Sequence, residues 1–240
     1  ELYLNYQPVS IVSLIGKKGK DQKNMSELPP EEIYDYACED ADITFQLKAI
    51  FEPEIQKEHL KELFYSIEMP LVDVLKSMEQ EGIAINSESL HNYSTELETM
   101  LVDLEISIKS EAGMEFNIDS PKQLGQVLFD VMELSSKAKK TKTGQYATGE
   151  DVLQKLKNTH SIIPMILDYR QLRKLKNTYV DPLPELMDKV DGRIHTNYMQ
   201  AVAATGRLSS NNPNLQNIPI RSEKGREIRK AFISRGPAFK

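Results

Sequence analysis

Apolar side chains recur every three to four residues along two successive stretches of the chain, and this spacing predicts two amphipathic helices. In the first stretch, residues 60–78, Pro70 interrupts the pattern and predicts a kink or a fresh helix start. The second helix is expected to begin at a cap formed by Ser87 and to end at Gly113. Because the link around Gly82 is short, we expect the two helices to form an antiparallel hairpin.

Local start and stop signals predict the other long helices. Pro29-Pro30, followed by two glutamates, predicts a helix over about 31–51, because early acids suit the positive end of the helix dipole. Its expected inward residues are Ile33, Ala37, Leu47 and Ile50. Ser120-Pro121 predicts a further helix start, with the serine as the cap. A last long helix is predicted over about 161–179, with inward residues Ile162, Ile166, Tyr169, Leu172 and Leu175.

Shorter patterns predict one more helix start and two strands. Thr148 with Asp151 resembles a capping box, which predicts that a helix begins there. Beyond Pro184 the helical spacing of apolar residues stops, and apolar and polar side chains alternate over residues 192–198 in the manner typical of a strand. A second strand is expected within residues 228–234. The strands are few and short beside the helices.

Composition places the chain among ordinary globular proteins. Its 240 residues are 40% apolar, which allows a sizeable core, and 28% charged. No apolar run approaches the length of a membrane span, and no secretion signal is visible at the start. The one cysteine, Cys38, has no internal partner for a disulfide, which suits a reducing compartment. We therefore expect a soluble intracellular protein with no membrane partner.

Charge is divided unequally along the chain. Residues 1–134 hold 10 Lys and Arg against 27 Asp and Glu, whereas residues 135–240 hold 20 against 9. The net charge of −6 therefore hides a basic second half. Such an asymmetry indicates a surface that binds a polyanion, and it is equally consistent with a dipolar surface that only aids solubility.

Two basic features of the second half could follow a row of phosphates. Arg170, Arg173, Lys174 and Asn177 share one stripe of the predicted helix over 161–179, opposite its apolar side. The alternative is a helix face that is merely solvated. A lysine-rich loop precedes this helix and contains Lys137, Lys139, Lys140, Lys142 and Gly144. This loop could bind the phosphates of a nucleic acid or could be a disordered solubilising loop.

A polar segment over residues 205–221 concentrates amides and hydroxyls around Arg207. Its candidate binding residues, besides Arg207, are Asn214, Gln216 and Asn217. Arginine and amide groups can donate to the minor-groove acceptors of adenine and thymine, which every pair offers in similar places. This composition favours a reader of base-pair geometry, although the same amides could simply cap turns.

Tyr36 and Asp40 lie four residues apart in the predicted helix over 31–51 and share one face. A carboxylate beside a phenol could bind Mg²⁺ and orient a water for phosphodiester cleavage, but acids near a surface tyrosine are common. Elsewhere, no group of His, Cys and Asp has the spacing of a zinc site, and the nucleotide-binding glycine motifs are absent.

Together these motifs resemble the family A DNA polymerases. Thr205-Gly-Arg-Leu-Ser-Ser and Pro213-Asn-Leu-Gln-Asn-Ile-Pro are similar to the family segment that enters the palm and grips the primer–template minor groove. Tyr36-Ala-Cys-Glu-Asp resembles the third motif of the family's 3′–5′ exonuclease domain. Ser120-Pro-Lys-Gln-Leu, the Lys140-Thr-Lys-Thr-Gly loop and the run from Tyr169 to Tyr179 resemble thumb segments. The resemblance covers essentially the whole chain.

The resemblance implies a mainly α fold with minor β (α+β), in which a helical thumb is flanked by truncated exonuclease and palm pieces. The implied domains are the C-terminal part of an exonuclease-like domain over 1–62, the thumb over 63–185 and the start of the palm over 186–240. The implied partners are primer–template duplex DNA and, in the parent protein, deoxynucleoside triphosphates. The resemblance also implies a cytoplasmic, bacterial-type protein that is a monomer. The implied parent reaction is Mg²⁺-dependent, DNA-directed nucleotidyl transfer in replication and repair, with proofreading as a further activity.

The resemblance also assigns roles to individual residues. Asp40 would be a metal ligand of the exonuclease site, and Tyr36 would orient the attacking water. The implied DNA-binding residues are Arg207, Asn214, Gln216, Asn217, Arg170, Lys174, Lys140 and Lys142. The family's polymerase aspartates would follow Lys240, so we expect this chain alone to be inactive. The alternatives are a duplex-binding module without catalysis and a helical protein-interaction domain.

Overall fold

The computed structural model describes residues 2–136 and 138–234. The chain divides into two compact units, Glu1–Lys76 and Ser77–Lys240. Both are mainly helical, with short strands in the second, which confirms the predicted fold class. Across the described residues, none of the helices is both long enough and apolar enough to cross a membrane.

The first unit is built around one long helix. Its helical segments are α1 (Ile11–Ile15), a 3₁₀ turn (Met25–Glu27), α2 (Pro30–Lys57), α3 (Lys61–Leu63), a π-helical turn (Phe64–Glu68) and the start of α4 (Met69–Glu81). Pro30 opens α2, and Glu31 and Glu32 occupy its first turn, as predicted. Of the predicted inward residues, Ile33, Leu47 and Ile50 are half-buried. The prediction for Ala37 is wrong, because the described part of the unit covers α2 at other positions and leaves Ala37 exposed.

Pro70 lies next to a change of helix type. The π-helical turn Phe64–Glu68 runs directly into α4, which begins at Met69, and the backbone of Met69 is itself helical. Proline has no backbone N–H to donate, and the Met69 N–H before it donates to the Phe64 carbonyl in the π-helical pattern. The predicted interruption is therefore a π-helical turn within a continuous helical segment, and the fresh helix start is wrong. α4 ends at Gly82, whose φ of 61° lies in the left-handed region.

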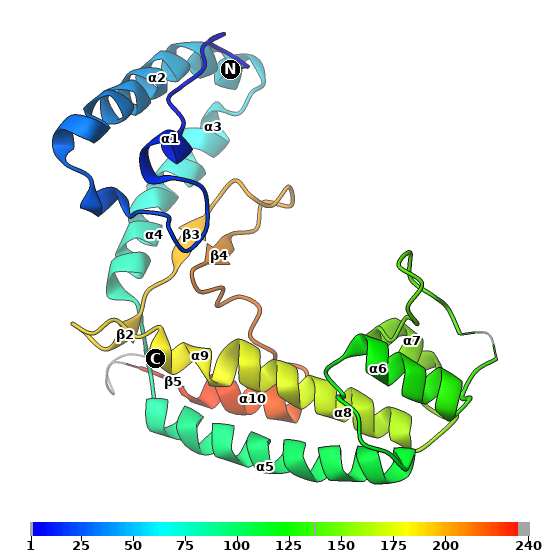
Figure 1. Ribbon diagram of the computed structural model, residues 1–240. Helices are drawn as coiled ribbons and strands as arrows, with labels where there is room; N and C mark the ends of the chain where they lie inside the picture. The colour runs from blue at the N-terminus through cyan, green and yellow to red at the C-terminus, as the bar shows by residue number, and fades with distance from the viewer. Residues whose placement is uncertain (1, 137, 235–240) are drawn as a thin grey trace. The chain divides into compact units, whose positions relative to one another are not determined.

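The second unit is organised by two long helices, α5 (Ser87–Ala112) and α8 (Ile162–Leu175), which lie side by side (Figure 1). Each buries the apolar stripe that its sequence predicts, including Leu97 and Ile166, which have no exposed surface. The predicted hairpin is wrong in its partner, because α5 packs along α8, and strand β1 (Ile83–Ile85) occupies the link after Gly82.

The predicted end of α5 is correct, whereas its predicted cap is one residue away from the observed one. Gly113 ends the helix with φ 68°, and its N–H donates to carbonyls of the last turn, as predicted. The cap at the other end is Asn86, whose side chain accepts from the Ser89 N–H at 2.9 Å. Ser87 is already the first helical residue, so its predicted role as the cap is wrong. A cap needs extended backbone, and Asn86 has it.

Short helices surround this pair. They are α6 (Pro121–Gln126), a π-helical turn (Val127–Val131), α7 (Glu150–Lys155), a π-helical turn after α8 (Lys176–Val180), α9 (Pro182–Glu185) and α10 (Glu223–Lys230). Ser120 caps α6, as predicted. The predicted capping box at Thr148 is wrong, because Gly149 takes the cap position of α7 and the Thr148 hydroxyl is bound by Arg170.

Two small antiparallel sheets complete the second unit. In one, β1 pairs with β2 (Arg193–Ile194) and with β5 (Phe232–Ile233). In the other, β3 (Asn197–Met199) pairs with β4 (Ser209–Asn211). The strand predicted over 192–198 is therefore two strands in different sheets. The strand predicted over 228–234 is confirmed at β5, whereas its first residues end helix α10.

His195 joins the strand region to the end of α4. Its Nδ1 lies 2.7 Å from the Glu79 carbonyl oxygen, and its Nε2 lies 3.0 Å from Asp191 Oδ2. Both partners are acceptors, so the doubly protonated ring satisfies both. The bond to the Glu79 carbonyl raises the pKa of His195; burial opposes this rise, and the charges of Asp191 and Asp188 add to it.

This geometry predicts a pH dependence. Because the folded-state pKa of His195 is raised, its stabilising contribution is complete below the unfolded pKa of about 6.5 and is lost as the pH rises through the folded value. We expect NMR titration to give a folded pKa above the ordinary one. The protection of amides around β1 and β2, taken relative to their base-catalysed intrinsic exchange rates, should fall over that interval, and His195→Gln should remove this fall. A folded pKa at or below the ordinary value would contradict the prediction.

Candidate nucleic-acid interface

The basic stripe of α8 is divided between internal contacts and solvent. The Arg170 guanidinium donates to the Thr148 carbonyl and, at 3.3 Å, to the Thr148 hydroxyl. Arg173 Nε lies 3.3 Å from Asp119 Oδ2, so this cation is paired. Lys174 is exposed. Burial lowers the pKa of Arg170, although a guanidinium stays protonated at neutral pH. Arg170 therefore holds the loop before α7 in place, and Lys174 is the lysine of the stripe that is exposed to solvent.

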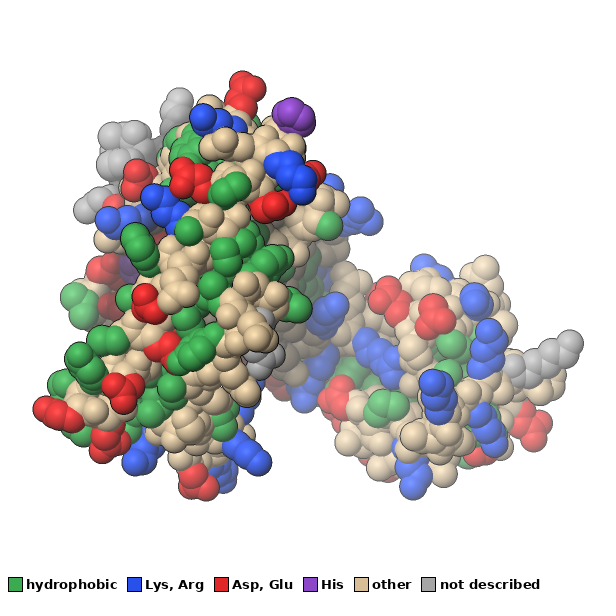
Figure 2. Space-filling model, turned by 90° about the horizontal axis from the view of Figure 1, so that it is seen from above, with side chains coloured by type: hydrophobic (Ala, Val, Ile, Leu, Met, Phe, Trp, Pro, Cys, Tyr) green, Lys and Arg blue, Asp and Glu red, His purple; other side chains and the backbone are tan. Residues whose placement is uncertain are grey.

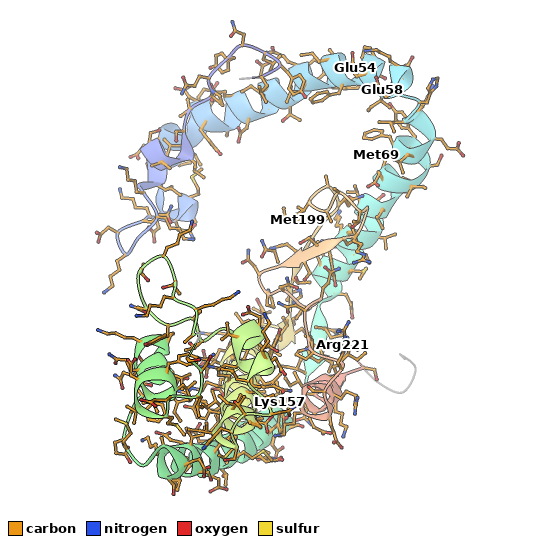
Figure 3. The ribbon with its side chains drawn as sticks, turned by 90° about the vertical axis from the view of Figure 1, so that its right-hand side faces the viewer. Glu54, Glu58, Met69, Lys157, Met199 and Arg221 are labelled. Atoms are coloured by element: carbon orange, nitrogen blue, oxygen red, sulfur yellow. The ribbon has the colours of Figure 1, made fainter. Side chains whose placement is uncertain are left out.

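A groove brings part of this stripe beside the polar segment. It has a volume of about 780 Å³ and runs between α7 and α8 on one wall and residues 216–222 on the other. Its lining includes four cations, Lys157, Arg170, Lys174 and Arg221, and the amide-bearing Gln171, Gln216 and Asn217. Lys157 and Arg221, both labelled in Figure 3, come from the two different walls. Glu150 and Asp168 also line the groove, so its charge is mixed with a basic excess.

The polar segment exposes the side chains that were singled out from the sequence. Arg207, Asn214, Gln216 and Asn217 are all exposed. Asn214 Oδ1 accepts from the Gln216 N–H at 3.0 Å, so the turn-capping alternative holds for this amide oxygen. The Asn217 backbone carbonyl accepts from the Tyr179 hydroxyl at 2.8 Å. The segment is thus tied down by its backbone and by one Asx turn, while Gln216 and Asn217 face the groove.

Buried hydroxyls fix the start of this segment, and sequence reasoning missed them. Thr196 Oγ1 lies 2.7 Å from Ser210 Oγ and is also within 2.7 Å of the Pro213 carbonyl oxygen. Ser210 Oγ in turn accepts from the Leu215 N–H at 3.1 Å. Both hydroxyl residues are buried. The strand alternation around residue 196 was the available signal, because it places Thr196 on the same inward side as Ile194.

The lysine-rich loop folds as a short hairpin. Lys140 bridges to Tyr146, and the Gly144 N–H donates to the Thr141 carbonyl at 3.0 Å to close the tip. The Lys140 ammonium lies 4.8 Å from the centre of the Tyr146 ring, a cation–π contact. Lys140 and Lys142 are both exposed, and Figure 2 shows Lys and Arg side chains gathered on the lobe that carries this loop, α6 and α7. Lys137 lies outside the described residues.

Tyr36 and Asp40 lie on α2 in the first unit. Tyr36 is half-buried and Asp40 is exposed. The charge of Asp40 raises the pKa of Tyr36. The neighbouring Glu39 is held by the Tyr6 hydroxyl and the Val9 N–H. Over residues 2–136 and 138–234, three or more His, Cys, Asp or Glu side chains do not come together in a group that could hold a metal ion.

The structure thus joins some predicted site residues and separates others. Arg170, Lys174, Gln216 and Asn217 share the groove. Arg207 lies in the exposed turn before β4, and Lys140 and Lys142 lie on the hairpin, which borders a second hollow with Arg170. Lys157 and Arg221 were missed, because a lone exposed lysine after a short helix carries no periodic signal.

Comparisons with known proteins agree with one another. The sequence model described as DNA polymerase family A matches residues 87–239. The chain is 44% identical to DNA polymerase I of Chloroflexus aurantiacus over 238 residues, which is 98% of this chain and 25% of that protein. It is 47% identical to DNA polymerase I of Geobacillus stearothermophilus over 184 residues, 77% of this chain and 21% of that protein. The chain thus spans about a quarter of the length of the curated relatives it matches.

A solved structure shares both fold and sequence with the chain. It is the POL domain of Pol1 from M. smegmatis, in complex with DNA primer-template and dNTP. The TM-score is 0.71 and the identity 41%, over 85% of this chain and 35% of that one.

Proposed function

This chain belongs to DNA polymerase family A, and we therefore propose that it is the part of a template-directed DNA polymerase that grips primer–template duplex. In this proposal, residues 1–62 are the end of a 3′–5′ exonuclease-like domain, 63–185 the helical thumb and 186–240 the start of the palm. The division of labour follows from the side chains: cations of the thumb bind backbone phosphates, and amides of the palm entry meet the minor groove.

The single observation that carries the proposal is the groove. It has Lys157 and Lys174 on one wall and Gln216, Asn217 and Arg221 on the other. Phosphate contacts fix the register of a duplex without selecting its sequence, and amide donors to minor-groove acceptors test pair geometry with equal indifference to sequence. A polymerase must hold every sequence that it copies. The local task of these residues is therefore positioning, which supplies orientation rather than chemistry.

The parent reaction would be nucleotidyl transfer from deoxynucleoside triphosphates, with Mg²⁺ ions supplying charge stabilisation at the reacting phosphate. The residues described here do not fit such a site, since no group of three or more His, Cys, Asp or Glu side chains among them could hold a metal ion. Asp40, which the resemblance assigns to the exonuclease site instead, is one carboxylate whose neighbour Glu39 is already bound within the unit, and one carboxylate does not make a two-metal centre. We therefore derive no chemical step through a metal and restrict the proposal to DNA binding.

The test is the binding of this chain to a fluorescent primer–template, followed by anisotropy at several salt concentrations. The logarithm of the affinity should fall with the logarithm of salt by a slope of about 0.9 per phosphate contact. Lys174→Ala should weaken binding to all sequences and flatten that slope by about one unit. Arg207→Ala should weaken binding to a paired primer end most. Lys48→Ala, an exposed lysine of α2, is the matched control and should leave the slope unchanged.

The outcomes separate the proposal from its alternatives. Binding by a duplex-specific, salt-sensitive mode that Lys174→Ala weakens would support the clamp. A folded chain that binds no duplex would contradict it and favour a helical protein-interaction domain. If Lys48→Ala and Lys174→Ala changed the slope equally, binding would be diffuse, and the groove would not be the site.

A further inference from the structure

Tyr179 lies where the thumb helix meets the polar segment. It belongs to the π-helical turn Lys176–Val180 that follows α8, and its side chain is buried. Its hydroxyl donates to the Asn217 carbonyl at 2.8 Å, across 38 residues of sequence. Asn217 is an amide residue that lines the same groove as Lys174. One hydrogen bond therefore connects the helix that carries the phosphate contacts to the loop that carries the amides.

The π-helical turn that holds Tyr179 is itself anchored to α5. Lys176 Nζ donates to Ser94 Oγ at 2.8 Å and lies 3.0 Å from Asp181 Oδ2. Ser94 also donates to Asp181, so the three groups close a network. Burial opposes ionisation of Asp181, but the bonds from Ser94 and Lys176 outweigh it and lower the pKa of Asp181. Because Lys176 at the start of the turn and Asp181 just after it are both hydrogen-bonded, the backbone that carries Tyr179 is held in place.

The other end of the polar segment is fixed independently. The Thr196 and Ser210 hydroxyls hold the backbone at Asn211, Pro213 and Leu215. Asn214 then caps the Gln216 N–H. The Tyr179 hydroxyl adds a hydrogen bond at the far end of the segment, at Asn217, an exposed residue that lines the groove. An exposed amide can discriminate between base-pair geometries only when its backbone is held in place. An amide on a mobile loop would adjust its position to any bound duplex.

We propose that Tyr179 is a positioning residue: its hydroxyl sets the place of Asn217 so that the amide meets the minor-groove edge of the terminal base pair while Lys174 binds the backbone. This inference rests on the proposed function, and it adds the coupling between phosphate binding and minor-groove reading. Without the Tyr179 hydroxyl, the chain would still bind the DNA phosphates, but the Asn217 amide would no longer be held at the minor-groove edge of the base pair. Tyr179→Phe should therefore affect the reading of the base pair more than the electrostatic attraction.

The chain offers a matched control in Tyr93. Its hydroxyl also donates to a backbone carbonyl, that of Lys224, at 2.8 Å, and it also joins a long helix to the C-terminal part of the unit. Tyr93 lies on α5, and its bond ends in α10 rather than in the amide segment. Tyr93→Phe removes the same chemistry at the same distance. A general loss of packing would appear in both variants, whereas a positioning effect would appear in Tyr179→Phe.

The experiment compares two duplexes that differ in one minor-groove atom. One carries adenine at the terminal pair, and the other carries 3-deazaadenine, which has a C–H in place of the N3 acceptor. A net hydrogen bond gives a difference of about fivefold, so the wild-type chain should bind the second duplex about fivefold more weakly. Tyr179→Phe should bind the normal duplex about fivefold more weakly and show less than a twofold difference between the two duplexes. Its salt slope should equal that of the wild type.

A second measurement is made without DNA. Amide hydrogen exchange at residues 215–218 should be about tenfold faster in Tyr179→Phe, since a lost hydrogen bond frees the loop end. Tyr93→Phe should leave this exchange unchanged. Equal exchange in the two variants would overturn the positioning role regardless of any binding result.

The two proposals fail in different ways. A Tyr179→Phe chain that keeps the fivefold discrimination between the duplexes would overturn the inference while leaving the duplex clamp intact. A wild-type chain that binds no duplex would overturn the proposed function, and with it the role of Tyr179 in reading a base pair. Discrimination that is lost in Tyr179→Phe and kept in Tyr93→Phe would support both.

Discussion

Ile166→Ala is expected to weaken the packing of α8 on α5 by about 3 kcal/mol, within the usual 2–5 kcal/mol for removing a buried isoleucine side chain. Ile166 has no exposed surface and belongs to the buried stripe of α8, the helix that packs along α5. The loss combines the transfer free energy of the missing methyl and methylene groups with the cavity that they leave. Since about 1.4 kcal/mol is a factor of ten, amide exchange in α8 should become roughly a hundredfold faster.

Hydrogen exchange read by peptide is the suitable measurement, because the chain has two units and a single unfolding curve would mix them. Ile106→Ala is the matched control: Ile106 lies on α5 and is 62% exposed. Its replacement should change the opening free energy by less than about 0.5 kcal/mol. If the two variants behaved alike, the seam between α5 and α8 would not hold the unit together.

Gly82→Ala is expected to destabilise the junction of α4 and β1 by about 2–4 kcal/mol, the sum of two penalties. The φ of 61° places this residue in the left-handed region, where an alanine adds about 1–2 kcal/mol of strain. A Cβ would also lie 2.9 Å from the Ile194 carbonyl oxygen and 2.8 Å from the His195 ring. The carbonyl belongs to β2, which pairs with β1 and cannot move away freely.

Gly113→Ala separates the two penalties. Gly113 has a similar φ of 68°, but a Cβ there would meet nothing within 4 Å. We expect it to show the conformational strain of about 1–2 kcal/mol and no more. The excess in Gly82→Ala, read from amide exchange in β1 and β2, then measures the steric overlap with Ile194. Equal effects at the two glycines would show that the approach of β2 to the helix end is not tight.

Local signals predicted most of the helices correctly. Gly113 ends α5, Ser120 caps α6, and the apolar stripe of α8 is buried at every predicted position. These features depend on a few neighbouring residues and on the period of the helix, which is why a sequence contains them. The errors at Ser87 and Thr148 lie within one residue of the true caps, Asn86 and Gly149, because several polar residues in a row can each form a cap.

The candidate site was predictable in its residue types and less so in its geometry. Arg170 and Lys174 follow from the period of α8, and the amides of residues 214–217 stand out by composition. The hydrogen bonds between Arg170 and Thr148 could not be predicted, because Thr148 lies 22 residues away in the sequence and outside α8. Lys157 and Arg221 join the groove for the same reason: long-range packing brings them there.

The sequence by itself determined the helices, their buried stripes, the basic second half and the motifs of the polar segment, since each depends on short-range periodicity or on side-chain chemistry. The tertiary structure decided which helix α5 packs along, how one predicted strand became β2 and β3, and how Tyr179 meets Asn217. These contacts join residues tens of positions apart. Their free energy comes from surfaces that touch only after folding, so no local pattern records them.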